Sequence, residues 1–183
     1  MHPGAKVSQR AIRYFFKFGR NLLTPNLIFA SEAVISCQLL NNIVFTNEKL
    51  FRFKMIDSPL CAFRQTEVES PEHLFFHCDI TKSFWHLLFS WISEQNVIST
   101  SLMLQNVIFG VFNVVEDFHS LNHIILLAKY YIYNCKLNII YPSLKVFIAK
   151  VKATCQIEQK IAATGNKLVK HYKKWNKFLP CFS

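Results

Sequence analysis

Apolar residues recur every three to four positions along most of this chain, which is the spacing of amphipathic helices. The pattern predicts helices over residues 8–19, 30–42, 46–53, 71–92, 100–115, 119–138 and 144–161. Residues 100–115 and 119–138 are apolar on nearly every side, so they are expected to lie buried between other elements. Glycine, with 4 residues, is too scarce for a turn-rich β architecture. The predicted fold class is therefore mainly α.

Local signals predict where the central helices begin and end. Thr46 or Asn47 is a suitable cap for the helix over residues 46–53. Ser70-Pro71-Glu72 has the composition of a helix start, with serine as the N-cap, proline at the first helical position and an acid in the first turn. The helix that follows is expected to reach Ile92, in one piece or in two pieces broken near Asp79.

Charge is distributed unevenly along the chain. The formal net charge is +10, from 21 Lys plus Arg against 11 Asp plus Glu. Residues 145–177 contain nine lysines and a single acid, Glu158. This one-sided charge favours an anionic partner, RNA or DNA. The residues expected to bind nucleic acid are Lys160, Lys167, Lys170, His171, Lys173, Lys174 and Trp175.

The basic stretch allows two interpretations. Lysines at helical spacing would displace counterions from a phosphate backbone, while Tyr172 or Trp175 would stack on an unpaired base. The alternative is a solvated face that covers an apolar seam containing Phe147, Val151 and Cys155. The sequence leaves both open.

Hydropathy and composition limit which other partners and which cellular location are expected. No run of about 18 apolar residues is free of charge, so a membrane span is not expected. No small-molecule site is evident. An intracellular location in nucleus or cytoplasm is expected, and the acid-free, aromatic N-terminus leaves a mitochondrial presequence as the alternative.

One group of cysteine and histidine residues has the spacing of a zinc knuckle: Cys61-x2-Arg64-x8-His73-x4-Cys78. Thiolate and imidazole are the ligands that zinc prefers, and a tight turn followed by a helix start brings such ligands together. The fourth ligand is missing, because Arg64 stands where it belongs and a guanidinium has no acceptor. The knuckle is therefore degenerate, and its expected metal ligands are Cys61, His73, Cys78 and His77.

On a regular helix, His73 and Cys78 would not face the same metal ion. His73 and Cys78 would lie about 140° apart, because each residue advances by about 100°. A break in the helix would correct this, and His77 lies one turn from His73 on the same face. Two interpretations stay open: a weakened zinc site with His77 or water as the fourth ligand, or a decayed knuckle whose thiols and imidazole pack or face solvent.

The residues around the knuckle resemble the zinc-binding region downstream of the reverse transcriptase in non-LTR (LINE-type) retrotransposon polyproteins. The similar positions are residues 39–50, residues 58–61, Glu69, residues 71–75, Cys78 and Phe84-Trp85. The resemblance implies a Cys-Cys-His-Cys zinc set on Cys61, position 64, His73 and Cys78, and Arg64 makes zinc doubtful. It continues more loosely through Ile108-Phe109-Gly110 and Lys174-Trp175 into the C-terminal tail of the polyprotein. No Tyr-x-Asp-Asp motif occurs, so a truncated copy that lacks the polymerase is implied.

Four segments follow from these features: a basic N-terminal segment outside the resemblance (1–38), a zinc-binding-like region (39–95), apolar helices (96–141), and a basic amphipathic helix and tail (142–183). The expected architecture is a small helical domain with a degenerate zinc-knuckle loop and a long basic C-terminal helix. The expected function is non-enzymatic, with RNA or DNA bound by the basic stretch. The alternative is an inert helical relic with no selected activity and no metal.

Overall fold

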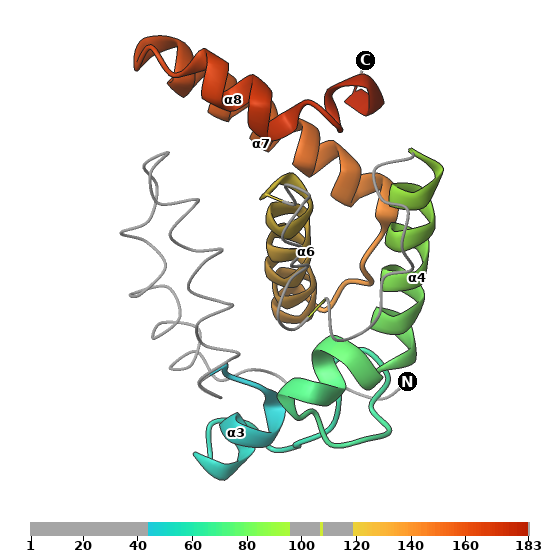
Figure 1. Cartoon of the computed structure of the whole chain (residues 1–183). Coiled ribbons are helices and arrows are strands. Elements are labelled where there is room, and N and C mark those ends of the chain that lie inside the picture. The colour runs from blue at the N-terminus through green and yellow to red at the C-terminus, as the bar shows by residue number, and fades with distance from the viewer. Residues whose placement is uncertain (1–43, 96–106, 108–118, 183) are drawn as a thin grey trace. The chain divides into compact units, whose positions relative to one another are not determined.

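The computed structural model describes residues 44–95, 107 and 119–182 (Figure 1). Within these residues the chain is mainly helical, as predicted, and the only β feature is an isolated antiparallel bridge between Leu60 and Val68. The helices are α3 (Asn47–Arg52), a π-helical turn (His73–His77), α4 (Asp79–Glu94), α6 (His119–Asn138), α7 (Leu144–Thr164), α8 (Leu168–Trp175) and a 3-10 turn (Leu179–Phe182). The helices expected over residues 8–19, 30–42 and 100–115 lie outside the described residues, apart from Val107.

Two of the predicted boundaries are confirmed. Helix α6 spans the predicted residues 119–138. The expected N-cap at Ser70 is present, since its hydroxyl accepts a hydrogen bond from the backbone N–H of His73 at 3.1 Å. The helix after it breaks at Cys78, whose backbone is extended (φ −62°, ψ 128°). The two-piece version of that helix is therefore the correct one.

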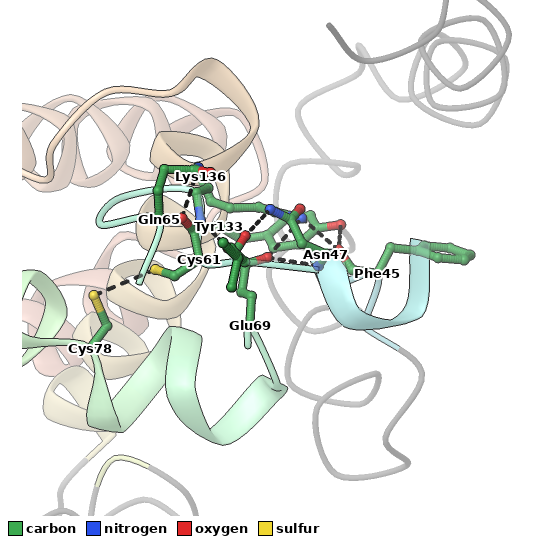
Figure 2. Close-up of polar contacts among 10 residues, drawn as sticks. Phe45, Asn47, Cys61, Gln65, Glu69, Cys78, Tyr133 and Lys136 are labelled. Atoms are coloured by element: carbon green, nitrogen blue, oxygen red, sulfur yellow. Dashed lines mark hydrogen bonds and ion pairs between the residues drawn. The ribbon is translucent and has the colours of Figure 1, made fainter. Parts of the chain in front are cut away.

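The described residues form two compact units. Unit 1 contains residues 44–82 and 132–141, and a buried carboxylate, Glu69, organises it (Figure 2). Glu69 accepts hydrogen bonds from the backbone N–H of Asn47 at 2.9 Å and of Ala62 at 2.8 Å. The first bond caps α3, where the Thr46 side chain makes no capping bond, and the second holds the turn beside Cys61. One side chain thus links the start of α3 to the Cys61 turn.

The counter-charge for Glu69 comes from Lys136, which is also buried. Its ammonium lies 3.3 Å from the Glu69 carboxylate and donates to the carbonyl of Phe45 at 2.8 Å. Burial lowers the pKa of Lys136, while the neighbouring Glu69 acts in the opposite direction. Removing either partner would leave a buried charge unpaired, and the contacts of Lys136 connect residues 132–141 to Glu69 and Phe45.

Unit 2 contains residues 83–131 and 142–182. Its core is aromatic: the ring of Phe84 on α4 lies 5.7 Å from Tyr131 on α6 and 5.5 Å from Phe147 on α7. Such tilted and edge-to-face pairs add to the stabilisation that burial itself provides. Among the described residues, no helix combines the length and hydrophobicity that crossing a bilayer requires.

Helices α7 and α8 pack against each other and form a structure that we call the C-terminal hairpin (residues 144–175). The chain turns between the two helices at residues 165–167. Gly165 ends α7, and Asn166 adopts a left-handed backbone (φ 52°), a conformation that asparagine tolerates better than most residues. The predicted long basic helix is therefore a basic helix followed by a second, shorter one.

Candidate metal centre

Three of the expected metal ligands converge in unit 1. The ligand atoms of Cys61, His73 and Cys78 all lie within 4.8 Å of one another, and all three residues are buried. The sulfurs of Cys61 and Cys78 are 3.8 Å apart (Figure 2). Cys61 belongs to the turn held by Glu69, His73 begins the π-helical turn, and Cys78 follows it.

The π-helical turn solves the geometrical problem that a regular helix poses. The backbone N–H of Cys78 donates to the carbonyl of His73 at 2.8 Å, five positions back instead of four. A turn closed over five residues brings Cys78, and not His77, back to the side of His73. Single π turns of this kind are frequent at functional sites.

His77 is therefore placed differently from the expectation. Its side chain is exposed, and its ring is not one of the three donors within 4.8 Å. The physical reason is the wider turn, since residues four apart share a face only when the helix keeps its regular period. The structure thus places His77 outside the group of three converging donors.

His73 has the arrangement of a metal-ligating histidine. Its Nδ1 lies 2.8 Å from the Glu67 carboxylate, while its Nε2 is buried and has no hydrogen-bond partner. A neutral imidazole that donates from Nδ1 has its lone pair on Nε2. Carboxylates commonly hold zinc-binding histidines in this way, fixing tautomer and ring orientation. An orphaned buried nitrogen costs free energy, and a metal ion would satisfy it.

The two thiols are electronically unequal. The Cys61 thiol donates to the Cys78 sulfur, which raises the pKa of Cys61 and lowers that of Cys78 to about 6. Backbone N–H groups of Phe63 and Arg64 at Cys61, and of Ile80 and Thr81 at Cys78, stabilise negative sulfur. Thiolate is the form that binds metal, so Cys78 is prepared for an ion, whereas Cys61 would have to release its proton on binding one.

The donor set and its spacing fit zinc. Two sulfurs bound to one tetrahedral zinc ion at about 2.3 Å lie about 3.8 Å apart, which is the separation found here. A nitrogen and a sulfur bound to the same zinc ion lie about 3.6 Å apart. The ligand atoms here lie within 4.8 Å of one another, so the distance from the imidazole nitrogen to the sulfurs would have to shorten by about 1 Å at most. A side-chain rotation of His73 would cover that distance.

Arg64, at the position of the missing ligand, is directed to solvent. Its guanidinium pairs with the Asp79 carboxylate at 2.7 Å, and both side chains are exposed. Asp79 thus balances the positive charge of the Arg64 guanidinium. Among the residues that the structure describes, three potential metal donors converge, and no fourth histidine, cysteine or carboxylate joins them.

The expected nucleic-acid residues separate into two groups in unit 2. Lys160, Lys167, Lys170 and Lys173 are exposed on the C-terminal hairpin. His171 and Trp175 are buried, and Lys174 is partly buried. The structure thus places His171 and Trp175 away from the solvent surface, because both side chains face the seam between the two helices.

Glu158 explains this burial, and it was not among the site residues predicted from the sequence. Its carboxylate accepts hydrogen bonds from the indole N–H of Trp175 at 2.7 Å and from Lys174 at 2.9 and 3.0 Å, and His123 lies 3.2 Å away. Burial acts to raise the pKa of Glu158, but these three partners outweigh it and lower the pKa to about 2. One feature of the sequence could have indicated a buried carboxylate: Glu158 is the only acid of this stretch, and it lies three residues after Cys155, on the apolar side of the helix.

Comparison with known proteins gives one match. Residues 23–85 match a family described as zinc-binding in reverse transcriptase, which confirms the resemblance of this segment. The matched segment includes Cys61, His73 and Cys78, and the family's description agrees with the chemistry of this cluster. No match was found among curated proteins or among solved structures.

Proposed function

We propose that this chain is a non-enzymatic protein that binds one zinc ion through Cys61, His73 and Cys78 and binds nucleic acid through its C-terminal hairpin. The observation that carries the metal half is the convergence of two buried sulfurs, 3.8 Å apart, with a buried imidazole nitrogen that lacks a hydrogen-bond partner. When bound, zinc would cross-link the Cys61 turn to the π-helical turn and so stabilise unit 1.

The contacts of the cluster residues indicate how each would hold a zinc ion. Cys61 and Cys78 would supply two thiolates, and His73 would supply Nε2 while Glu67 holds its Nδ1. Glu69 positions the Cys61 turn through the backbone N–H of Ala62. Two thiolates neutralise the dication, so the buried site would carry no net ligand–metal charge.

Native mass spectrometry of the full chain, recorded after zinc addition and dialysis, tests the metal half. We expect one zinc ion per wild-type chain and at least about a tenfold lower occupancy in Cys61→Ser, because only two protein ligands remain. Cys181→Ser is the matched control, since that partly exposed thiol lies outside the cluster, and its zinc content should equal that of wild type. Wild-type protein without zinc would contradict the proposal and favour a decayed knuckle.

The nucleic-acid half rests on charge. In residues 142–182, Glu158 is the only acid, and it is buried, whereas every lysine except Lys174 is exposed. The solvent face of the C-terminal hairpin therefore carries several positive charges and no exposed negative charge. Such a surface attracts a phosphate backbone by releasing its counterions.

Neutralising three lysines of the hairpin (Lys167→Gln, Lys170→Gln and Lys173→Gln) is expected to weaken RNA and DNA binding about tenfold at about 100 mM salt, and to reduce the salt dependence. Fluorescence anisotropy with labelled 20-nucleotide strands measures both effects. The charge-matched control carries Arg52→Gln, Lys54→Gln and Lys82→Gln, three exposed positions outside the hairpin. Equal losses in the two triple variants, or no wild-type affinity at low salt, would remove the nucleic-acid half.

A further inference from the structure

The C-terminal hairpin exposes one aromatic ring among its lysines. Trp175, the other aromatic candidate, is 0% exposed and donates its indole N–H to Glu158. Tyr172 is 44% exposed, and it lies in α8 between the exposed residues Lys170 and Lys173. The burial of Trp175 thus leaves Tyr172 as the ring that an incoming ligand meets.

The Tyr172 ring is also held in place. Its hydroxyl accepts a hydrogen bond from the side-chain amide of Gln159 on α7 at 2.9 Å. The His171 ring packs edge-on against it, with centroids 5.6 Å apart and an interplanar angle of 70°. A ring anchored at both ends loses little rotamer freedom when a ligand stacks on it, so less binding free energy is spent on ordering.

We infer that the C-terminal hairpin binds single-stranded nucleic acid, with one unpaired base stacked on Tyr172 and the flanking lysines contacting phosphates. This inference rests on the proposed nucleic-acid function and specifies its substrate class. A single strand presents free base faces, while a duplex hides them within the stack. Lysines alone would bind either form through charge, so the exposed ring is the feature that separates the two.

The same surface fits other partners less well. A second copy of the chain would bring together two faces that carry lysines and no exposed acid, which like-charge repulsion opposes. An anionic lipid surface shares the phosphate chemistry, and Val169, 84% exposed, would favour it. Lipid contact would depend on apolar area and not on an aromatic face, so a substitution of Tyr172 that keeps its apolar area separates the two.

Fluorescence anisotropy with the full chain tests the inference. The probes are a labelled 15-nucleotide oligouridylate, the matching oligothymidylate, and a 15-base-pair duplex, with vesicles of phosphatidylserine and phosphatidylcholine as a fourth arm. We expect Tyr172→Leu to weaken binding of both single strands about tenfold, the magnitude of one lost stacking contact, and to leave duplex affinity unchanged. Tyr172→Phe keeps the ring and should stay within about twofold of wild type.

Each other outcome would overturn the inference. Equal effects of Tyr172→Leu on single strand and duplex, or no effect on either, would leave charge as the sole determinant and preserve only the proposed function. Tighter binding to vesicles than to any oligonucleotide would assign the surface to lipid. An absence of binding to all probes at low salt would reject the nucleic-acid half of the proposed function as well. Helical circular dichroism of each variant confirms that the fold is retained.

Discussion

Arg64→Cys is expected to raise the affinity of the chain for zinc about 100-fold. A four-ligand structural site binds zinc with roughly 10–16 kcal/mol, so one ligand corresponds to about 3 kcal/mol. Position 64 is suited to the fourth thiolate because it stands two residues beyond Cys61 in a turn that Glu69 already holds. Its backbone N–H already donates to the Cys61 sulfur, so the loop faces that sulfur. Competition against a chromophoric chelator at pH 7 measures the change.

The control for this variant is Arg64→Ser, which removes the guanidinium without adding a zinc ligand. It breaks the ion pair with Asp79, an exposed contact that contributes about 0–1 kcal/mol at most. We expect its zinc affinity to stay within about threefold of wild type. If Arg64→Ser gained as much affinity as Arg64→Cys, charge removal would be the cause and the argument from a missing ligand would fail.

Glu158→Gln is expected to lower the free energy of unfolding by about 3 kcal/mol, the cost of breaking a buried charge pair. The amide retains the size of Glu158 but loses the charge that Lys174 and His123 face, and it accepts the Trp175 indole less strongly. Urea unfolding followed by circular dichroism gives the value. The control, Glu94→Gln, removes an exposed acid from α4 and should change stability by no more than about 0.5 kcal/mol.

The contribution of Glu158 also has a predicted pH dependence. The pKa of Glu158 is lowered from 4.5 to about 2 in the folded state. Between these two pH values the folded protein keeps the carboxylate charged, whereas the unfolded chain binds a proton there. The stabilisation is complete above about pH 4.5 and is lost as the pH falls towards 2. The stability difference between wild type and Glu158→Gln should therefore shrink between pH 6 and pH 3. A difference that stays constant over this range would contradict the charge-pair account.

Helical content and several helix boundaries were predictable because they depend on local interactions. The period of apolar residues predicted α6 at residues 119–138, where the structure has it. Ser70 was identifiable as an N-cap since its hydroxyl bonds to a backbone N–H only three residues away. The break before Asp79 was also predictable. The π turn that produces it was not, because nothing in residues 73–78 distinguishes a backbone hydrogen bond to the fifth preceding residue from one to the fourth.

The contacts of the buried charges were not predictable. Glu69 and Lys136 are 67 positions apart in the sequence, and Glu158 and Trp175 are 17 apart. Contacts over such separations produce no periodic pattern from which they could be predicted. The exposure of Tyr172 and the burial of Trp175 follow from the second of these contacts. Both rings lie in the same basic helix, and helical spacing alone gave no reason to separate them.

The spacing of Cys61, His73 and Cys78, the arginine at position 64 and the one-sided charge of residues 145–177 were determined by the sequence, since each is a property of residue order. Tertiary structure decided which of these groups can act. The π-helical turn brought Cys78, and not His77, to the side of His73, and Glu67 holds Nδ1 of His73 while its buried Nε2 has no hydrogen-bond partner. Glu158 removed Trp175 from the surface and left Tyr172 there. The physical reason is the same in each case: a ligand atom or ring acts only where backbone path and distant partners direct it.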